Sequence, residues 1–229
     1  MNIDPSKIVS VDRFERKWDI RNDIDTNAFF IAISRSNFMF TELYSARNVN
    51  TIYFDDIDYS SISENLNGVR FKQKYRLRWY GNFETISKPQ LEIKSKNGLI
   101  GKKTTFPIEI SKDIKLDYDG LEEISNIFAK KLGISKILYP ILSTHYLRHY
   151  FVSSDKNIRA TFDKNLKSFQ MHTFLNLSFK KDFNNSIFEI KYNKNYDNYV
   201  KKNLKNISLR MSKSSKYVTT ALDEPIGFS

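Results

Sequence analysis

Cysteine is absent from this chain of 229 residues. Disulfides, thiolate metal sites and cysteine nucleophiles are therefore excluded. Glycine and proline are also scarce, at 7 and 5 residues, so no segment has the composition of a linker or a low-complexity region. The sequence contains no internal repeat. We therefore expect one domain over residues 1–229, which is long enough to bury a core.

Long apolar runs are missing as well. The longest, Ala28–Ile33, falls far short of the roughly 20 residues that a membrane-spanning helix needs. The N-terminal segment Met1–Val11 lacks the apolar centre of a signal peptide, since Asp4 interrupts it. We expect a cytoplasmic protein and leave open its attachment to the inner face of a membrane.

Acidic residues are too few to balance the basic ones. The chain has 37 Lys and Arg against 26 Asp and Glu, which gives a formal net charge of +11. This excess indicates a polyanionic partner: nucleic acid, an anionic membrane surface or a phosphorylated small molecule. Charge alone does not choose among the three.

The dominant pattern is period-two alternation of apolar and polar residues, which is typical of β-strands. Strands are predicted near residues 8–20, 49–55, 69–81, 86–96, 100–110, 138–152, 156–164, 168–181 and 185–193. Helices are predicted from Asp25 or Thr26 to about Ala46, and at Tyr59–Leu66, Asp119–Leu132, Tyr196–Leu204 and Ser212–Leu222. Eight or nine strands with mostly short connections favour an antiparallel sheet that curls or closes. The predicted fold class is α+β, an antiparallel β-barrel tunnel of about eight strands with helices packed outside.

The faces of the predicted strands differ in charge. Successive side chains of a strand point to opposite faces, so the segment Val69–Tyr80 gathers its cations on one face and its apolar residues on the other. The cations are Arg70, Lys72, Lys74, Arg76 and Arg78. Five like charges in a row repel one another. The same division recurs on other strands, whose charged faces carry Arg13, Glu15, Lys17, Glu92, Lys94, Lys96, Arg148, Arg159, Asp163, Glu189 and Lys191.

Two interpretations of the charged faces compete. For a single strand, the solvated face of a sheet is the simpler explanation. For six strands with the same excess of cations, convergence on one lumen explains the pattern better. Such a lumen needs anions to fill it, and Arg guanidinium groups fit phosphate oxygens. Most of the acids then pair with cations, while Glu189 and Glu15 are candidate ligands of a divalent ion that phosphate oxygens also coordinate.

Eight short motifs follow one another along the chain. They are Arg13-x-Glu15-x-Lys17, Tyr53-Phe54-Asp55, Arg76-x-Arg78-x-Tyr80, Glu92-x-Lys94, Tyr146-x-Arg148, Arg159-x-Thr161-x-Asp163, Glu189-x-Lys191 and Ser215-Lys216-Tyr217. The series resembles the catalytic domain of the vacuolar transporter chaperone (VTC) family, a branch of the triphosphate tunnel metalloenzymes, from about Val11 to Leu222. The resemblance implies a tunnel-shaped barrel that polymerises inorganic polyphosphate from ATP with Mn²⁺ or Mg²⁺.

The resemblance also implies roles for single residues. Catalytic phosphate ligands would be Lys17, Arg76, Arg78, Lys94, Arg148, Arg159 and Lys216. Tyr146 and Ser215 would donate hydrogen bonds to substrate, Glu189 would hold the metal, and Lys102 or Lys103 would add a tunnel cation. The remaining cations of the charged faces, Lys96, Lys191 and Arg13, are further candidate substrate ligands.

This sequence departs from the wider superfamily in two respects. Arg13 stands where the superfamily has the first Glu of its Glu-x-Glu-x-Lys motif, which favours the polymerase branch. The phosphate-sensing and membrane parts of the eukaryotic complexes are not found here. Regulation and any coupling to transport, including a membrane-protein partner, would therefore need separate chains.

Two alternative functions remain open at this point. One is a triphosphatase that hydrolyses inorganic triphosphate or a nucleoside triphosphate in the same tunnel. The other is a non-catalytic module that binds polyanions or RNA. Phe71, Tyr75 and Trp79 lie opposite the cations, where they suit a core better than a platform for stacked bases. No specific nucleic-acid partner is therefore expected.

Overall fold

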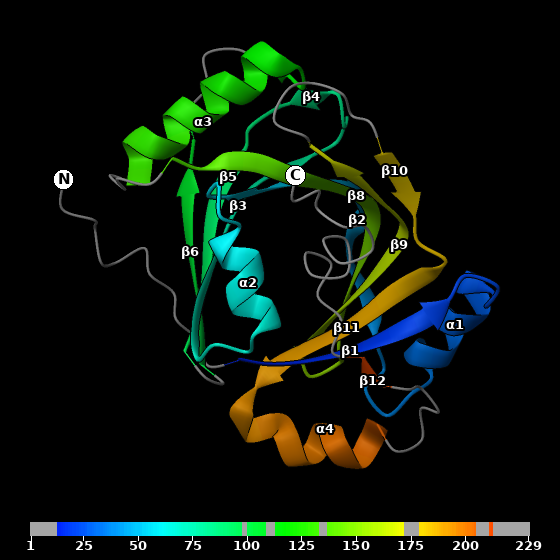
Figure 1. Ribbon diagram of the computed structural model, residues 1–229. Coiled ribbons are helices and arrows are strands. Elements are labelled where there is room, and N and C mark those ends of the chain that lie inside the picture. Colours follow the sequence, from blue (N-terminus) through cyan, green and yellow to red (C-terminus); the bar gives the residue numbers. More distant parts are fainter. Residues whose placement is uncertain are drawn as a thin grey trace.

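The computed structural model describes residues 13–97, 100–108, 113–132, 137–171, 179–204 and 211–212 (Figure 1). Its strands are β1 (Arg13–Arg21), β2 (Thr41–Asp55), β3 (Phe71–Tyr80), β4 (Thr85–Ile86), β5 (Gln90–Asn97), β6 (Ile100–Pro107), β7 (Ile114–Lys115), β8 (Tyr139–Val152), β9 (Ile158–Gln170), β10 (Phe179–Asp182), β11 (Asn185–Asn193) and β12 (Met211–Ser212). Its helices are α1 (Thr26–Ser34), α2 (Ser60–Leu66), α3 (Tyr118–Leu132), the 3₁₀ turn η2 (Lys194–Tyr196) and α4 (Asp197–Leu204).

Ten strands form one sheet in the order β12-β1-β11-β9-β8-β2-β3-β5-β6, with β10 paired to β9. All pairings in it are antiparallel. The sheet curls so far that Lys94 of β5 contacts Glu15 of β1 at 3.5 Å, although these strands lie near opposite ends of the order. In the part of the chain that the structure describes, no backbone ladder joins the two margins. The predicted antiparallel tunnel is confirmed, and side chains bring its margins together.

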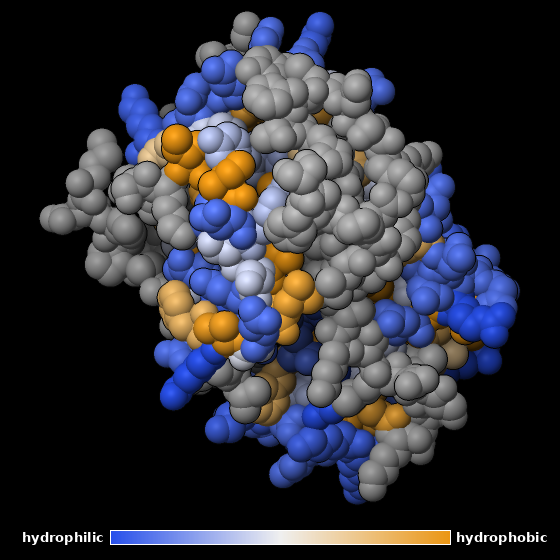
Figure 2. Space-filling model, in the orientation of Figure 1, coloured by the Kyte–Doolittle hydropathy of each residue, from blue (hydrophilic) through white to orange (hydrophobic). Residues whose placement is uncertain are grey.

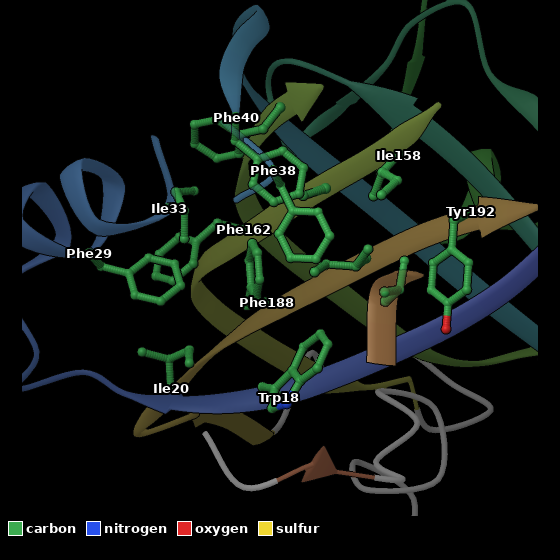
Figure 3. Packing of buried hydrophobic residues seen from close by; sticks show 14 residues of the cluster. Trp18, Ile20, Phe29, Ile33, Phe38, Phe40, Ile158, Phe162, Phe188 and Tyr192 are labelled. Atoms are coloured by element: carbon green, nitrogen blue, oxygen red, sulfur yellow. The ribbon is translucent and has the colours of Figure 1, made fainter. Parts of the chain in front are cut away.

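The outward face of the sheet is apolar and is covered by helices. On one side, α1 packs on β9 and β11: the ring centroid of Phe29 lies 5.2 Å from those of both Phe162 and Phe188 (Figure 3). The buried side chain of Val200 in α4 joins the same cluster. On the other side, Ile124 of α3 packs in a second cluster that includes Leu77, Trp79 and Leu91. These helices lie outside the sheet, as predicted.

Helix α2 is different, because it packs on the inward face. Its buried Ile62 contacts a small cluster with Tyr53 of β2 and Leu142 of β8. The carboxylate of Asp55 fixes the start of α2, since it accepts hydrogen bonds from the backbone N–H groups of Ser61 at 2.9 Å and Ile62 at 3.1 Å. Figure 1 shows α2 (cyan) in front of the space enclosed by the sheet.

The prediction of a helix up to Ala46 was wrong. Helix α1 ends at Ser34, and β2 begins at Thr41. The first part of β2 pairs with β8 from Thr41↔Val152 to Asn48↔Leu147, with two register shifts. Backbone pairing with a distant strand therefore overrides the local helical spacing. Most of the predicted helix at Ser212–Leu222 lies outside the described residues.

The described surface seen in Figure 2 is mostly hydrophilic, with smaller separate hydrophobic patches. Among the helices that the structure describes, none has the length and apolar character needed to cross a membrane.

Candidate active site

The charged faces predicted from alternation lie on the inward side of the curled sheet. In β3, Leu77 and Trp79 point into the outer apolar core, so Arg76 and Arg78 point inward. The same reasoning places Lys17 inward on β1, where Trp18 belongs to the outer core. The strand pairings then align inward residues across neighbouring strands, and their side chains meet in three groups.

The first group is built around Glu92 of β5, whose side chain is 1% exposed. Its Oε2 lies 2.5 Å from Nε of Arg76 and 3.7 Å from Nη1 of Arg78, and its Oε1 lies 2.5 Å from Nζ of Lys103. Burial raises the pKa of Glu92, but the three cations outweigh burial and hold this pKa well below its usual range. Of the two residues named as a further tunnel cation, Lys103 makes this contact, and the side chain of Lys102 lies outside the described part of the structure.

The second group joins β8 and β9. The guanidinium of Arg148 donates to Asp163 through Nε at 2.6 Å and Nη2 at 2.7 Å, a bidentate ion pair with a fully buried carboxylate. The Arg148 guanidinium carbon also lies 5.1 Å from the ring centroid of Tyr146. Burial lowers the pKa of Arg148, yet Asp163 raises it well above its usual value. Both groups hold an arginine in a fixed orientation.

The third group lies where the sheet margins approach. Glu15 contacts Lys94 at 3.5 Å and Lys191 at 3.8 Å, and Lys191 contacts Glu189 at 3.2 Å. Burial lowers the pKa of Lys17, but Glu189 and Glu15 more than compensate and raise it. Cations and carboxylates from β1, β5 and β11 therefore share one small volume.

Glu15 and Glu189 have the chemistry of ligands for a hard divalent cation. They lie on adjacent strands, and each contacts the ammonium group of Lys191. Over the described ranges, no cluster of three or more His, Cys, Asp or Glu could hold a metal ion. Two carboxylates fit an ion whose remaining ligands are water and substrate phosphate oxygens, as is usual for Mg²⁺.

Lys74 lies among other cations inside the sheet, a position that the sequence analysis did not single out. It lay on the predicted cation face, but no role was assigned to it. Its backbone stands opposite that of Lys94. Burial, followed by repulsion from Lys94 and Lys17, lowers the pKa of Lys74 to about 7. Cations are thus crowded enough inside the sheet that one ammonium group loses its proton near neutral pH.

The other predicted site residues are located only by strand pairing, or lie outside the described part of the structure. Arg159 stands opposite Lys191 in the pairing of β9 with β11, and Lys96 stands opposite Lys72 in the pairing of β5 with β3. Arg13 begins β1, and its side chain lies outside the described part of the structure. Ser215 and Lys216 lie outside the described residues altogether.

Tyr53 was noticed in the sequence only as part of a motif. Its side chain faces inward and is 6% exposed. It lies close enough to Arg76 and Lys17 to raise the pKa of both groups, after the larger effects of burial and of the neighbouring carboxylates. Alternation within residues 49–55 could have placed Tyr53 on the inward face, but not beside cations of other strands.

Comparisons with known proteins agree with this geometry. The family model described as the VTC domain matches residues 10–222. A candidate adenylate cyclase from Vibrio parahaemolyticus is similar in structure, with a TM-score of 0.53 at 11% identity over 91% of this chain and 98% of that one. Another from Bacillus halodurans has a TM-score of 0.52 at 10% identity over 94% and 99%. A comparison with curated proteins found no match.

A protein from Pyrococcus horikoshii is similar as well, with a TM-score of 0.50 at 11% identity over 93% of this chain and 99% of that one. At such low identity these three likenesses concern the fold alone. They confirm the predicted tunnel fold, and the family match confirms the resemblance seen in the sequence.

Proposed function

Because the chain belongs to the VTC domain family, we propose that it is a polyphosphate polymerase that transfers the γ-phosphate of ATP to a growing inorganic polyphosphate chain. The observation that carries this proposal is the contact of Lys94 with Glu15 across the margins of the sheet. This contact makes the inward cations of separate strands line one space. A polyanion is the ligand that such a lining suits.

In the proposed reaction, a terminal oxygen of the phosphate chain attacks the γ-phosphorus of ATP. A new P–O bond forms, the bond from the γ-phosphorus to the β,γ-bridging oxygen breaks, and ADP leaves with that oxygen. Phosphoryl transfer needs alignment and charge neutralisation more than covalent help from the protein. Two polyanions must meet, and the cationic lining removes their repulsion.

Each group of the site has a part in this proposal. Arg76, Arg78 and Lys103 bind phosphate oxygens from the Glu92 side, and Arg148 binds them from β8. The bidentate pair of Arg148 with Asp163, the single contacts of Arg76 and Arg78 with Glu92, and burial keep these arginines aligned before substrate arrives, which lowers the cost of orientation. Further proposed ligands are Lys17, Lys94, Arg159, Lys216, Tyr146, Ser215, Lys96, Lys191 and Arg13.

Glu189 and Glu15 would hold Mn²⁺ or Mg²⁺ together with phosphate oxygens. When bound, such an ion offsets negative charge on the phosphates. The ammonium group of Lys191 contacts both carboxylates. A bound metal ion would take the place of this ammonium group beside them.

Sizing the products of purified protein incubated with ATP and Mn²⁺ tests the proposal. We expect a ladder of polyphosphate chains on a gel and ADP in matching amount. Arg76→Ala should lose the ladder, whereas Lys167→Ala, which removes a half-exposed cation of β9 paired with Asp182, should retain it. Orthophosphate as the only product besides ADP would instead identify a triphosphatase, and the polymerase proposal would be wrong.

A further inference from the structure

Two buried hydroxyl groups lie beside Arg78 on the inward face without hydrogen-bond partners. Thr51 of β2 and Thr144 of β8 are both 0% exposed. Neither their Oγ1 atoms nor Nε of Arg78 has a partner among the residues that the structure describes. Buried polar atoms are nearly always hydrogen-bonded, so three unpartnered ones in one place call for an explanation.

The three atoms belong to one row across three strands. Thr51 is opposite Arg78 in the pairing of β2 with β3, and opposite Thr144 in the pairing of β2 with β8. Side chains of directly opposite residues lie on the same face within about 5.5 Å of each other at Cβ. The row therefore presents a hydroxyl, a second hydroxyl and a guanidinium N–H to the same inward space.

The row continues the cationic face of β3 and borders an apolar patch on β2 and β8. On β3 it follows Lys74 and Arg76 at the two-residue spacing of one strand face. Beyond it along β2 and β8 come Val49 and Tyr146, which belong to a buried cluster with Leu166 and Ile187. The hydroxyl row thus lies between the cations and an apolar patch.

We infer that Thr51, Thr144 and Arg78 form an additional phosphate-binding subsite beside Arg76. This inference rests on the proposed function. A phosphate oxygen accepts hydrogen bonds from all three groups, because each Thr hydroxyl can rotate to donate. The subsite binds one phosphate unit of the chain beyond those held by Arg76 and Lys103. The two Thr hydroxyl groups are neutral, so they bind phosphate oxygens without adding positive charge to the crowded cations.

Isosteric removal of the hydroxyls tests the inference. Calorimetric titration of the full chain with inorganic triphosphate and with a longer linear polyphosphate should show that Thr51→Val and Thr144→Val each bind the longer chain about tenfold more weakly, the loss expected for a hydrogen bond to a charged group. Thr51→Ser keeps the hydroxyl and should bind within about twofold of wild type.

Ser143→Ala is a matched control on the same strand. Its Oγ is also buried and unpartnered, but Ser143 is opposite Ile52, whose side chain packs in the outer core. This variant should leave the affinity unchanged. Because the Thr hydroxyls have no partner before substrate binds, both Val variants should also melt no lower than wild type without ligand.

The possible outcomes are distinct. Unchanged affinity of both Val variants for the longer chain would overturn the subsite, and so would a lower melting temperature without ligand, since that would reveal a structural partner. A wild-type protein that binds neither probe would contradict the proposed function instead.

Discussion

Lys94 and Glu15 form an ion pair, with Nζ 3.5 Å from Oε2, between strands near opposite ends of the ten-stranded sheet. Glu15 also contacts Lys191 of the adjacent strand. This relationship converts a row of charges on each strand into the lining of one enclosed space. The chemistry proposed for the chain depends on that enclosure.

The arginines beside Glu92 should be essential for transfer. Arg76→Ala and Arg78→Ala each remove a fixed donor from the place where charge develops, which should lower the rate by about a hundredfold or more. Steady-state rates of ADP release measure this effect, and Lys167→Ala is the control. Rates near wild type in both variants would contradict the assignment.

Removal of a proposed metal ligand should change metal dependence more than stability. For Glu189→Gln we expect the Mn²⁺ concentration at half-maximal rate to rise at least about tenfold, since even changes around metal ligands cost that much in affinity. Asp182→Asn, which alters an exposed carboxylate, should give the wild-type titration curve. An unchanged curve for Glu189→Gln would exclude it as a ligand.

Phosphate binding should be linked to protonation of Lys74. With its pKa at about 7, Lys74 is mostly neutral at pH 8 in the free protein. A bound polyanion favours the charged ammonium and raises this pKa, so the protein takes up a proton. The terminal phosphates of triphosphate also titrate in this pH range, but their contribution is the same for wild type and for Lys74→Gln. Affinity for triphosphate should therefore fall more steeply for wild type than for Lys74→Gln as pH rises from about 7 to 9.

Calorimetry of triphosphate binding at pH 8, in two buffers of different ionisation enthalpy, measures the uptake. We expect wild type to take up as much as one proton more than Lys74→Gln, with Lys167→Gln as control. Equal uptake by wild type and Lys74→Gln would show that another group is responsible.

Glu92 should stabilise the free protein against repulsion among Arg76, Arg78 and Lys103. Glu92→Gln leaves these cations uncompensated, and loss of one partner of a buried pair costs about 3–5 kcal/mol. Because the pKa of Glu92 is lowered by folding, its contribution is present above the usual Glu pKa and is lost as pH falls through the folded value.

Urea unfolding with and without triphosphate measures the effect of Glu92→Gln. Triphosphate should restore more stability to the variant than to wild type, because phosphate oxygens replace the missing carboxylate. Equal stabilisation of the two proteins would place the phosphates elsewhere.

The sequence predicted which side chains of a strand share a face better than it predicted how the strands are arranged in space. Alternation is a local property, so Arg76 and Arg78 on β3 were assigned to the inward face without knowledge of the fold. The approach of β5 to β1 is a long-range property, and no pattern in either segment indicates that Lys94 meets Glu15. A shared lumen was inferred from the charged faces that recur on six strands, and the family resemblance implied its tunnel shape.

Local irregularities also limited the prediction. Two strands were expected at 156–164 and 168–181, whereas β9 runs through Ile158–Gln170 with a register shift near Asn165, whose φ is 55°. The extra residue there changes which positions face inward, so parity before and after it differs. Arg70 was grouped with the inward cations, yet it precedes β3 and donates to Asn97 at an exposed position.

The central claim is that cations from separate strands grip one phosphate chain inside the curled sheet. A crystal structure of the protein with inorganic triphosphate and Mn²⁺ tests it most directly. We predict phosphate oxygens within hydrogen-bonding distance of Arg76, Lys94 and Arg148 at once. Triphosphate bound on the outer surface, with these three side chains still paired only to Glu92, Glu15 and Asp163, would contradict it.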